Sequence, residues 1–294
     1  MSVSADERAP DVSVVIPHFN QTALLAKCLE SLARQSIGRS RFEIIVADNG
    51  TPGGVDAVRA RFSDVIFTAA VERGAAHARN AALKLARGRA IAFIDADCVA
   101  APDWLERGLE GLSNADFCGG RIVVTVENEA RPTSVEAFER VFAFRQREYV
   151  EKKKFAATAN LFARREAAAA VGAFTNGLSE DVDWCRRGVA LGFRLAFNDK
   201  SIVSHPARRD WSELIRKWDR TIAERWAGYG GRGMIRNLSW IALAAATALS
   251  TAPHLIRVLT SADLKTARDR MAAALTLARI RCWRAWRMAS LIGS

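Results

Sequence analysis

The sequence predicts an α/β fold built on a parallel sheet, and three observations support this class. Short apolar runs rich in β-branched residues alternate with stretches of helical spacing. These runs are continuous, which is typical of strands buried on both faces of a parallel sheet. The chain has 294 residues, 50% of them apolar and 26% charged, which suffices for one large domain with an extension.

The first hundred residues show the clearest alternation. Strands are expected at 12–16, 42–47, 65–67 and 90–94. Pro17 is expected to end the first strand, and Thr22 to cap the helix that follows it. Helices are expected at 22 to about 35, after Gly54, and at 75–86. This order implies a parallel sheet with right-handed crossovers.

The pattern is mixed after residue 100. Strand character is found at 117–126, 193–197 and 201–204, and helical character at 134–149 and 182–190. A glycine-rich segment at 228–233 is the clearest flexible stretch and marks the expected domain boundary. The expected domains are therefore residues 12–227, divided into two halves at residue 100, and a helical extension at 234–294.

The net charge of +11 is concentrated near the C-terminus. From Ser204 onwards there are 16 Lys and Arg and 6 Asp and Glu, which leaves the rest of the chain nearly neutral. The same part holds six of the eight tryptophans: Trp211, Trp218, Trp226, Trp240, Trp283 and Trp286. Basic charge with tryptophan fits an anionic membrane surface at least as well as nucleic acid. Because no zinc-finger, helix-turn-helix or RNP-like signature is present, no nucleic-acid partner is expected.

Two stretches of the extension have the character of membrane-associated helices. Residues 238–252 are apolar and are expected to end at Pro253 and His254. They are shorter than the roughly 20 residues of a full span, so an embedded helix and a helix packed on the body both remain open. Farther on, helical spacing places Met271, Leu275, Ala278, Cys282, Trp286 and Ala289 on one face, with Arg281, Arg284 and Arg287 mainly away from it. That arrangement suits an interfacial helix on anionic lipid, and a docking helix is the alternative.

Cysteine usage and the N-terminus favour a reducing, cytoplasmic compartment. The five cysteines are scattered and form no Cys-x-x-Cys pair, which argues against a zinc ribbon. Residues 1–11 are polar and acidic, without the apolar core of a signal peptide. A cytoplasmic protein is therefore expected.

Asp95 and Asp97 lie one residue apart, directly after the expected strand at 90–94. Two ionised carboxylates this close repel each other and resist burial. A divalent cation removes both problems, and Mg²⁺ and Mn²⁺ prefer such oxygen ligands, often beside a substrate diphosphate. The pair predicts a metal–diphosphate site at the carboxyl end of a strand, where open α/β sheets bind their ligands.

Three further motifs accompany this pair in a fixed order. Residues 12–20 form a strand, a proline break and an asparagine, Asp48 ends the second strand, and Glu180-Asp181 precedes a helix. Together with 75–80 and 88–97, these motifs resemble family 2 glycosyltransferases of the GT-A fold over residues 12–226. The resemblance implies a Rossmann-like nucleotide-binding sheet with a smaller acceptor-side subdomain. It also implies inverting transfer from a nucleotide-sugar donor.

The resemblance assigns the donor side to residues of the first half. Pro17 and the loop up to Asn20 would line the nucleotide pocket. Asp48 would accept a hydrogen bond from the base, expected to be uracil. Arg79 would lie near the nucleotide or diphosphate, with a surface charge on an alanine-rich helix as the alternative.

The resemblance also implies a metal site. Asp95 would bind the ribose or support the metal. Asp97 would ligate Mg²⁺ or Mn²⁺. His205 would be a second ligand, with a purely structural histidine as the alternative.

On the acceptor side, Asp181 would be the catalytic base. Inversion requires an acceptor hydroxyl to attack opposite the leaving diphosphate, and a nearby carboxylate takes its proton. An acidic first turn of a helix is the alternative reading of Glu180-Asp181. Glu180, Asn160 and Trp184 would lie near the acceptor, although core packing is the alternative for Trp184.

One departure from the processive members of the family bears on the product. These carry Gln-x-x-Arg-Trp, whereas Arg225-Trp226 lacks the glutamine here, and no long spans are present. A single sugar is therefore expected to be added. The basic tail suggests a lipid-linked glycan acceptor, in exopolysaccharide, capsule or lipopolysaccharide assembly, at the inner face of the plasma membrane.

Three other functions are alternatives to this one. A nucleotidyltransferase of related fold needs a glycine-rich loop after the first strand, and residues 17–21 contain no glycine. A basic protein that binds membranes or nucleic acid is the second alternative, and no zinc-finger, helix-turn-helix or RNP-like signature supports binding to nucleic acid. A catalytically inactive scaffold is disfavoured by Asp95, Asp97 and Asp181 together.

Overall fold

The computed structural model describes residues 9–177, 179–231 and 233–293, and it divides into two compact units. The first unit comprises the chain up to Val123 together with Arg145–His205. The second comprises Val124–Phe144 and everything from Pro206. This division does not coincide with the boundary expected at 228–233, where Arg232 lies outside the described residues, as do residues 1–8 and Leu178.

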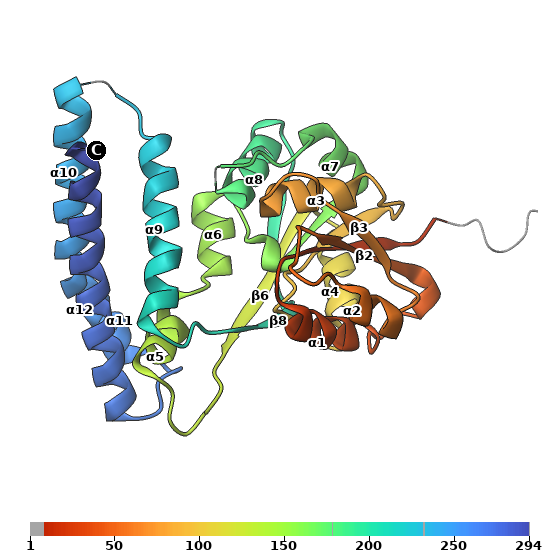
Figure 1. Ribbon diagram of the computed structural model, residues 1–294, viewed down its shortest axis with the longest axis horizontal. Helices are drawn as coiled ribbons and strands as arrows, with labels where there is room; N and C mark the ends of the chain where they lie inside the picture. The colour runs from red at the N-terminus through yellow and green to blue at the C-terminus, as the bar shows by residue number, and fades with distance from the viewer. Residues whose placement is uncertain (1–8, 178, 232, 294) are drawn as a thin grey trace, which may run out of the picture. The chain divides into compact units, whose positions relative to one another are not determined.

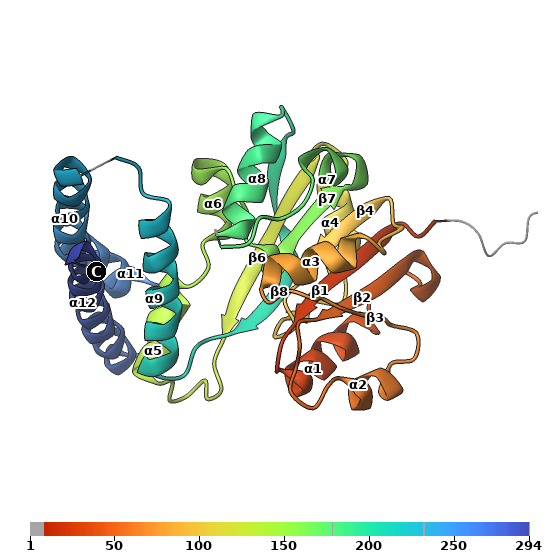
Figure 2. The same ribbon diagram turned by 45° about the horizontal axis from the view of Figure 1, so that its top comes forward.

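The first unit is built on an eight-stranded mixed sheet (Figure 2). In sheet order the strands are β3 (Ile66–Ala69), β2 (Phe42–Asp48), β1 (Val12–His18), β4 (Ala90–Phe93), β7 (Leu161–Arg164), β6 (Phe117–Thr125), β8 (Leu195–Pro206) and β5 (Val99–Ala100). Strands β1 to β4 pair in parallel, as predicted. The later pairs, β4 with β7, β6 with β7 and β5 with β8, are antiparallel, so the sheet is not parallel throughout.

Helices cover both faces of this sheet. They are α1 (Thr22–Leu32), α2 (Asp56–Arg61), α3 (Ala75–Leu83), α4 (Trp104–Gly111), α6 (Gln146–Lys153), α7 (Arg165–Val171) and α8 (Glu180–Ala190), with short 3-10 turns at Arg39–Arg41 and Thr158–Asn160. Figure 1 shows α3, α7 and α8 over one face and α1, α2 and α4 over the other. Phe93 and Phe117 are buried under the first set, and Phe162 packs against Trp104 of α4. The continuous apolar strands are thus buried from both sides, as expected for their composition.

Pro17 does not end β1, contrary to the prediction. The strand continues to His18, and Pro17 is in register with Ala47 of β2. The carbonyl of Val15 accepts a hydrogen bond from the Ile94 N–H. The odd-numbered residues of β1, including residue 17, therefore point their backbone N–H and C=O groups toward β4. Because β4 ends at Phe93, the N–H that proline lacks would have had no strand partner.

Other predicted elements also differ in extent. The helix expected at 134–149 is interrupted, giving α5 (Ser134–Phe142) in the second unit and α6 in the first. The two short strands expected at 193–197 and 201–204 are the single strand β8. Helix α1 is preceded by Gln21 rather than capped by Thr22, and no side chain caps it.

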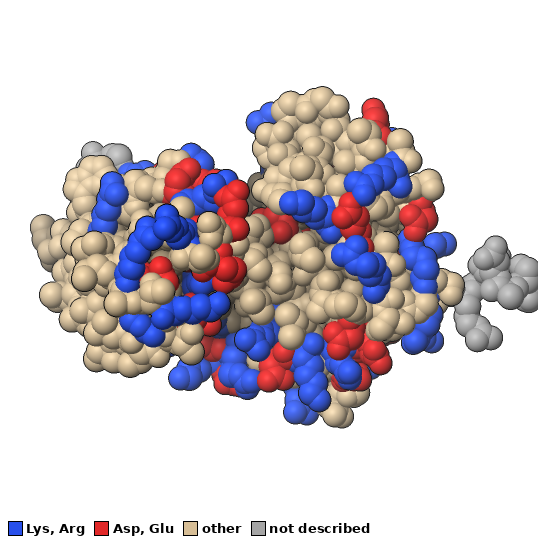
Figure 3. All heavy atoms as spheres, turned by 90° about the horizontal axis from the view of Figure 1, so that it is seen from below, with Lys and Arg blue, Asp and Glu red and all other residues tan. Residues whose placement is uncertain are grey.

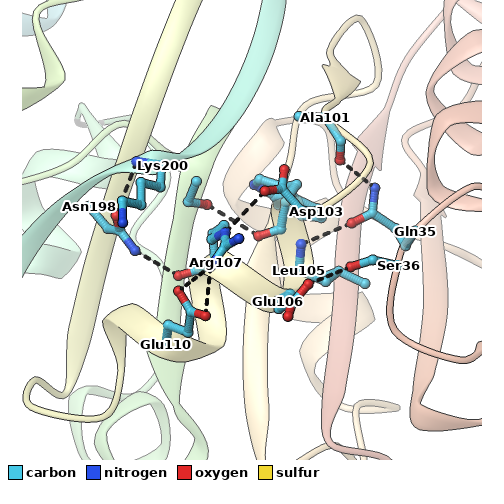
Figure 4. A network of polar contacts seen from close by, with 12 residues as sticks. Gln35, Ser36, Ala101, Asp103, Leu105, Glu106, Arg107, Glu110, Asn198 and Lys200 are labelled. Atoms are coloured by element: carbon cyan, nitrogen blue, oxygen red, sulfur yellow. Dashed lines mark hydrogen bonds and ion pairs between the residues drawn. The ribbon is translucent and has the colours of Figure 1, made fainter.

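A polar network fixes α4, which follows the Asp95–Asp97 segment (Figure 4). The Gln35 amide donates to the carbonyl of Ala101 at 2.7 Å and accepts from the Leu105 N–H at 2.9 Å. It therefore satisfies an N–H in the first turn of α4 that has no partner within the helix. On the other side, Asn198 of β8 donates to the carbonyl of Arg107 at 2.8 Å. The network joins α4 to the segment that follows α1 and to β8.

The second unit is helical. It contains α5, α9 (Trp211–Ala227), α10 (Gly233–Leu249), α11 (Thr251–Thr260), α12 (Ala267–Ser290) and a 3-10 turn at Leu291–Gly293. Helix α12 packs against α5, α9, α10 and α11. Pro253 does not end the apolar helix as expected, because it lies in the first turn of α11, where proline is tolerated. Ser250 keeps a helical backbone, so Gly233–Thr260 forms one helical stretch. Among the described residues it is the one helix that is both long enough and apolar enough to cross a membrane.

Candidate active site

The parallel strands β1, β2 and β4 bring acidic residues to one edge of the sheet. Asp48 is the last residue of β2, and His18 is the last residue of β1. Asp95 follows two residues after the end of β4. Because the carboxyl ends of parallel strands meet at the same edge, these side chains belong to one site within the first unit.

Asp48 is held in place from both of its carboxylate oxygens. His18 Nδ1 lies 2.9 Å from Oδ1, and the Thr51 hydroxyl donates to the same oxygen at 2.5 Å. The backbone N–H of Thr51 donates to Oδ2 at 3.1 Å. Burial alone raises the pKa of Asp48, but the hydrogen bonds from Thr51 and His18 outweigh it, so that the pKa lies below its ordinary value. Asp48 is therefore an ionised acceptor of fixed orientation.

The loop after β1 is fastened to the same cluster. The N–H of Gln21 donates to His18 Nε2 at 3.2 Å, so Nδ1 carries the proton that points to Asp48. Asn20 has a left-handed backbone with φ of 52° and donates its N–H to the Thr51 hydroxyl at 2.9 Å. The side chain of Asn20 is exposed, and Pro17 is half-buried beside it. The sequence predicted roles for Pro17, Asn20 and Asp48 but gave none to His18 or Thr51.

Arg79 projects from α3 into the interior and is only 4% exposed. One guanidinium nitrogen donates to Asp95 Oδ1 at 3.0 Å and another to Glu180 Oε1 at 2.8 Å. Burial lowers the pKa of Arg79, but Asp95 and Glu180 raise it by more, so the net pKa is above its ordinary value. The alternative of a surface charge on α3 is thereby excluded. Arg79 is a bridge between the Asp-x-Asp segment and the acidic pair of α8.

Asp181 lies in the first turn of α8, next to Glu180. Its Oδ1 accepts a hydrogen bond from the Val182 N–H at 2.8 Å. Burial raises the pKa of Asp181 to about 6, and repulsion from Glu180 acts in the same direction, whereas Arg79 lowers it. A carboxylate with a pKa near neutrality can both accept a proton and release it at physiological pH.

Asp97, Cys98 and His205 bring three ligand atoms within 4.8 Å of one another. His205 Nε2 lies 3.5 Å from Asp97 Oδ2, and the Cys98 thiol lies 3.9 Å from Asp97 Oδ1. A carboxylate with an imidazole is a donor set that Mg²⁺ or Mn²⁺ accepts. Burial raises the pKa of the Cys98 thiol well above its ordinary value. Mg²⁺ and Mn²⁺ prefer oxygen donors to sulfur, so Cys98 is the weakest ligand of the three. The sequence had suggested Asp97 and His205 but not their neighbour Cys98.

Two residues assigned to the acceptor side are buried by the protein itself. The Asn160 amide accepts from Trp104 Nε1 and donates to the carbonyls of Arg121 and Ser201, each at 2.9 Å. Trp184 is fully buried, and its ring stacks on Phe174 with centroids 4.9 Å apart. Neither placement supports contact with an acceptor, and for Trp184 the packing alternative describes what is found. Glu180, in contrast, is 28% exposed and stays beside Asp181.

Solved structures that resemble the whole chain have the GT-A fold of glycosyltransferases. The Pyrobaculum calidifontis mannosyltransferase PcManGT, in complex with GDP-Man and Mn²⁺, matches with a TM-score of 0.61 at 18% identity, over 97% of this chain and 87% of that one. S. aureus TarS in complex with UDP matches with a TM-score of 0.53 at 15% identity, over 95% of this chain and 90% of that one. The fold is thus a mixed α/β GT-A sheet followed by a helical C-terminal region.

Sequence comparison shows the family. The profile described as glycosyl transferase family 2 matches residues 13–172. The glycosyltransferase AglE of Haloferax volcanii is 33% identical over 217 residues, which cover 71% of this chain and 70% of that protein. The chain therefore belongs to the family 2 glycosyltransferases. Other relatives match over shorter segments, two of them over only 29% and 25% of their own length.

Proposed function

We propose that this protein is a metal-dependent, inverting glycosyltransferase that moves one sugar from a UDP-sugar to an acceptor hydroxyl. The observation that carries the proposal is Asp181, a half-buried carboxyl with a pKa of about 6 that shares its surroundings with Arg79, Asp95 and Glu180. Such a group is suited to take a proton from a hydroxyl at neutral pH. The family membership supports the same class of reaction.

The donor nucleotide would bind at the carboxyl edge of β1 and β2. Asp48, fixed by His18 and Thr51, would accept a hydrogen bond from the ring N–H of the base. The loop from Pro17 to Asn20 would line the base. TarS, which resembles this fold, is in complex with UDP, which supports the choice of a nucleotide but leaves its base to the test below.

The ribose and diphosphate would lie over the Asp95–Asp97 segment. Arg79 already donates a hydrogen bond to Oδ1 of Asp95, so Asp95 would accept a hydrogen bond from a ribose hydroxyl through Oδ2. Asp97 and His205 would hold the divalent cation, and PcManGT, in complex with Mn²⁺, supports a metal in this fold. When bound, a divalent cation stabilises the negative charge that develops on the leaving diphosphate.

The transfer itself would depend on Asp181. Its carboxylate takes the proton from the acceptor hydroxyl as that oxygen bonds to the anomeric carbon, opposite the departing nucleoside diphosphate. Arg79 keeps Glu180 in position and lowers the pKa of Asp181, so that more of it is ionised at neutral pH. Holding donor and acceptor in line supplies the remaining orientation.

The acceptor in this proposal is a lipid-linked glycan, and the setting is the inner face of the plasma membrane during exopolysaccharide, capsule or lipopolysaccharide assembly. Support comes from the apolar, mostly exposed stretch Gly233–Thr260. The lack of the processive Gln-x-x-Arg-Trp motif at Arg225-Trp226 supports addition of a single sugar.

A donor screen tests the proposal. Release of nucleoside diphosphate is measured for a panel of UDP- and GDP-sugars, with a polyprenyl diphosphate-linked sugar as acceptor and Mn²⁺ present. We expect release with one UDP-sugar, its abolition by a chelator, and its recovery on adding Mn²⁺. Release that is equally fast without metal would contradict the proposed metal site. Release from GDP-sugars alone would contradict the choice of UDP. If no donor gives release, the proposed reaction is contradicted.

A further inference from the structure

Large apolar side chains are exposed on three helices of the second unit. Among the described residues, 11 of the 16 such side chains lie here. On each helix they form one stripe, and together we call them the apolar stripes: Met234, Ile235, Leu238, Ile241 and Leu249 on α10, Leu255, Ile256 and Leu259 on α11, and Met271, Leu275 and Trp286 on α12. Isolated exposed apolar residues are ordinary, whereas stripes on adjoining helices indicate an interaction surface.

The stripes are the helix faces left over after the unit has packed. On α10 the opposite face is buried through Trp240 and Ala244, and the Trp240 indole donates to the carbonyl of Met288 at 2.7 Å. On α12 the opposite face is buried through Leu277 and Ile280, which join the core with α5 and α9. The unit therefore has its own core without the stripes, and another surface must account for their apolar character.

Charge identifies the kind of surface. From Pro206 onwards the chain carries 16 Lys and Arg against 6 Asp and Glu. Lys265, Arg268 and Arg279 are exposed on α12 or just before it, near Met271 and Leu275 in sequence. Figure 3 shows Lys and Arg side chains beside broad uncharged areas on one face of this unit. Apolar area next to cationic side chains is complementary to an anionic lipid surface.

Most of the tryptophans, in contrast, serve the unit itself. Arg284 lies over the Trp218 ring at 3.6 Å, and Arg236 over the Trp226 ring at 3.8 Å. Five of the six tryptophans of this region pack in its two apolar clusters, and Trp286 alone among them is largely exposed. The sequence analysis associated all six tryptophans with a membrane surface. Of these, Trp286 is the one that remains available for such contact, together with the other side chains of the apolar stripes.

The packing of α10 against α12 indicates whether these helices would cross a bilayer or lie at its surface. Helix α10 packs along α12 and is tied to it by Trp240. Helix α12 carries Arg268, Arg270, Arg279, Arg281, Arg284 and Arg287. An arginine at the centre of a bilayer costs roughly 3 kcal/mol on insertion scales, so a helix pair with six of them is excluded from the hydrocarbon core. The stretch Gly233–Thr260 is long and apolar enough to span a membrane, but its packing against α12 favours a position at the surface.

We propose that the apolar stripes seat the second unit on an anionic lipid bilayer, with α10, α11 and α12 parallel to the membrane plane. This deepens the proposed function by giving a lipid-linked acceptor its surface. Binding is measured without donor or acceptor, so a failure to bind leaves the transfer reaction untouched, and an inactive enzyme leaves the binding result standing.

Vesicle flotation with the full chain tests the proposal. We expect the protein to float with vesicles containing about one-third phosphatidylglycerol and not with pure phosphatidylcholine, and to be released by high salt or alkaline carbonate. The double variant Leu238→Asp/Ile256→Asp is expected to lose at least about tenfold in binding. Leu191→Asp is the matched control, because Leu191 is 59% exposed but lies in the first unit, and it should bind like the wild type.

Four results would overturn the proposal. The first is wild-type protein that does not float, and the second is a double variant that floats as well as the wild type. The third is protein that resists carbonate, as a protein that spans the bilayer would. The fourth is a wild-type protein that is a dimer in light scattering while the double variant is a monomer. The last result would assign the stripes to a second copy of the chain.

Discussion

Arg79 donates a hydrogen bond to Glu180 at 2.8 Å, although 101 residues separate them in the sequence. The same guanidinium holds Asp95 at 3.0 Å. One buried cation therefore joins the Asp-x-Asp segment after β4 to the acidic first turn of α8. Asp181 lies in the field of all three groups, and its pKa is set by their balance.

Glu180→Gln should move the acidic limb of the pH–kcat/KM profile to lower pH. The wild-type limb is expected near pH 6, because Asp181 must be ionised to act as base. Glutamine can still accept a hydrogen bond from Arg79 but removes the negative charge that raises the pKa of Asp181. We expect a shift of about half a pH unit or more, measured as kcat/KM from pH 4.5 to 8.

Arg79→Lys is the converse variant. A single ammonium cannot reproduce the forked contact with Asp95 and Glu180. The positive charge is therefore held less firmly beside Asp181 and lowers its pKa by less. The limb should therefore move to higher pH. If the acidic limb moved in the same direction in Glu180→Gln and Arg79→Lys, the opposing effects of Glu180 and Arg79 on the pKa of Asp181 would be contradicted.

Asp181→Asn should stabilise the protein at neutral pH. The pKa of about 6 lies above the value of 3.8 that serves as the reference for an unfolded chain. The folded state therefore binds the proton more tightly, and its stability falls as pH rises from about 4 to about 6. Removing the charge should raise the free energy of unfolding by about 1–3 kcal/mol at pH 8 and have no such effect below pH 4. Urea denaturation at both pH values measures this, and a loss of stability at pH 8 would refute it.

His18→Phe should weaken nucleotide binding with little effect on kcat. Phenylalanine fills the buried space but removes the hydrogen bonds to Asp48 and from Gln21. We expect the Kd of UDP, measured calorimetrically with Mn²⁺, to rise about tenfold, which corresponds to about 1.4 kcal/mol. His77→Phe is the control, because that histidine pairs with the exposed Glu72 at 3.4 Å, and equal effects of the two variants would contradict a special role for His18.

Metal binding should depend on Asp97 and His205 but not on Cys98. Asp97→Asn is expected to weaken Mn²⁺ binding in the presence of UDP by more than about tenfold, and His205→Asn by about severalfold. Cys98→Ser should bind like the wild type, because Mn²⁺ prefers oxygen donors to a thiol. Electron paramagnetic resonance of free Mn²⁺ measures all three. A Cys98→Ser variant as weak as Asp97→Asn would show that the thiol is a ligand.

The positions of Asp48 and Asp95 at one edge of the sheet could be predicted because their signals are local. Strands buried on both faces are read from continuous β-branched runs, and Asp48 and Asp95 follow directly from where β2 and β4 end. The partners of Arg79 lie 16 and 101 residues away, so no local pattern could show that it is buried. The antiparallel pairing of β7 with β4 and β6 could not be predicted from the sequence either, because the direction of a strand in a sheet depends on segments far away in the chain.

Burial is the property that the sequence could not show for Asn160 and Trp184, two of the residues expected on the acceptor side. Asn160 and Trp184 are residue types that serve equally in sugar binding and in the core, and only burial separates the two roles. Pro253 was expected to end a helix, yet proline fits the first turn of a new one. These distinctions depend on the position of each residue in the folded chain.

The transfer rate of Asp181→Asn, measured beside its affinity for UDP and Mn²⁺, tests the proposed reaction most directly. With a competent donor and acceptor, we predict that kcat/KM falls by about 10²–10⁴ while the Kd of UDP with Mn²⁺ stays within about twofold of the wild type. Turnover equal to that of the wild type would show that Asp181 is not the base.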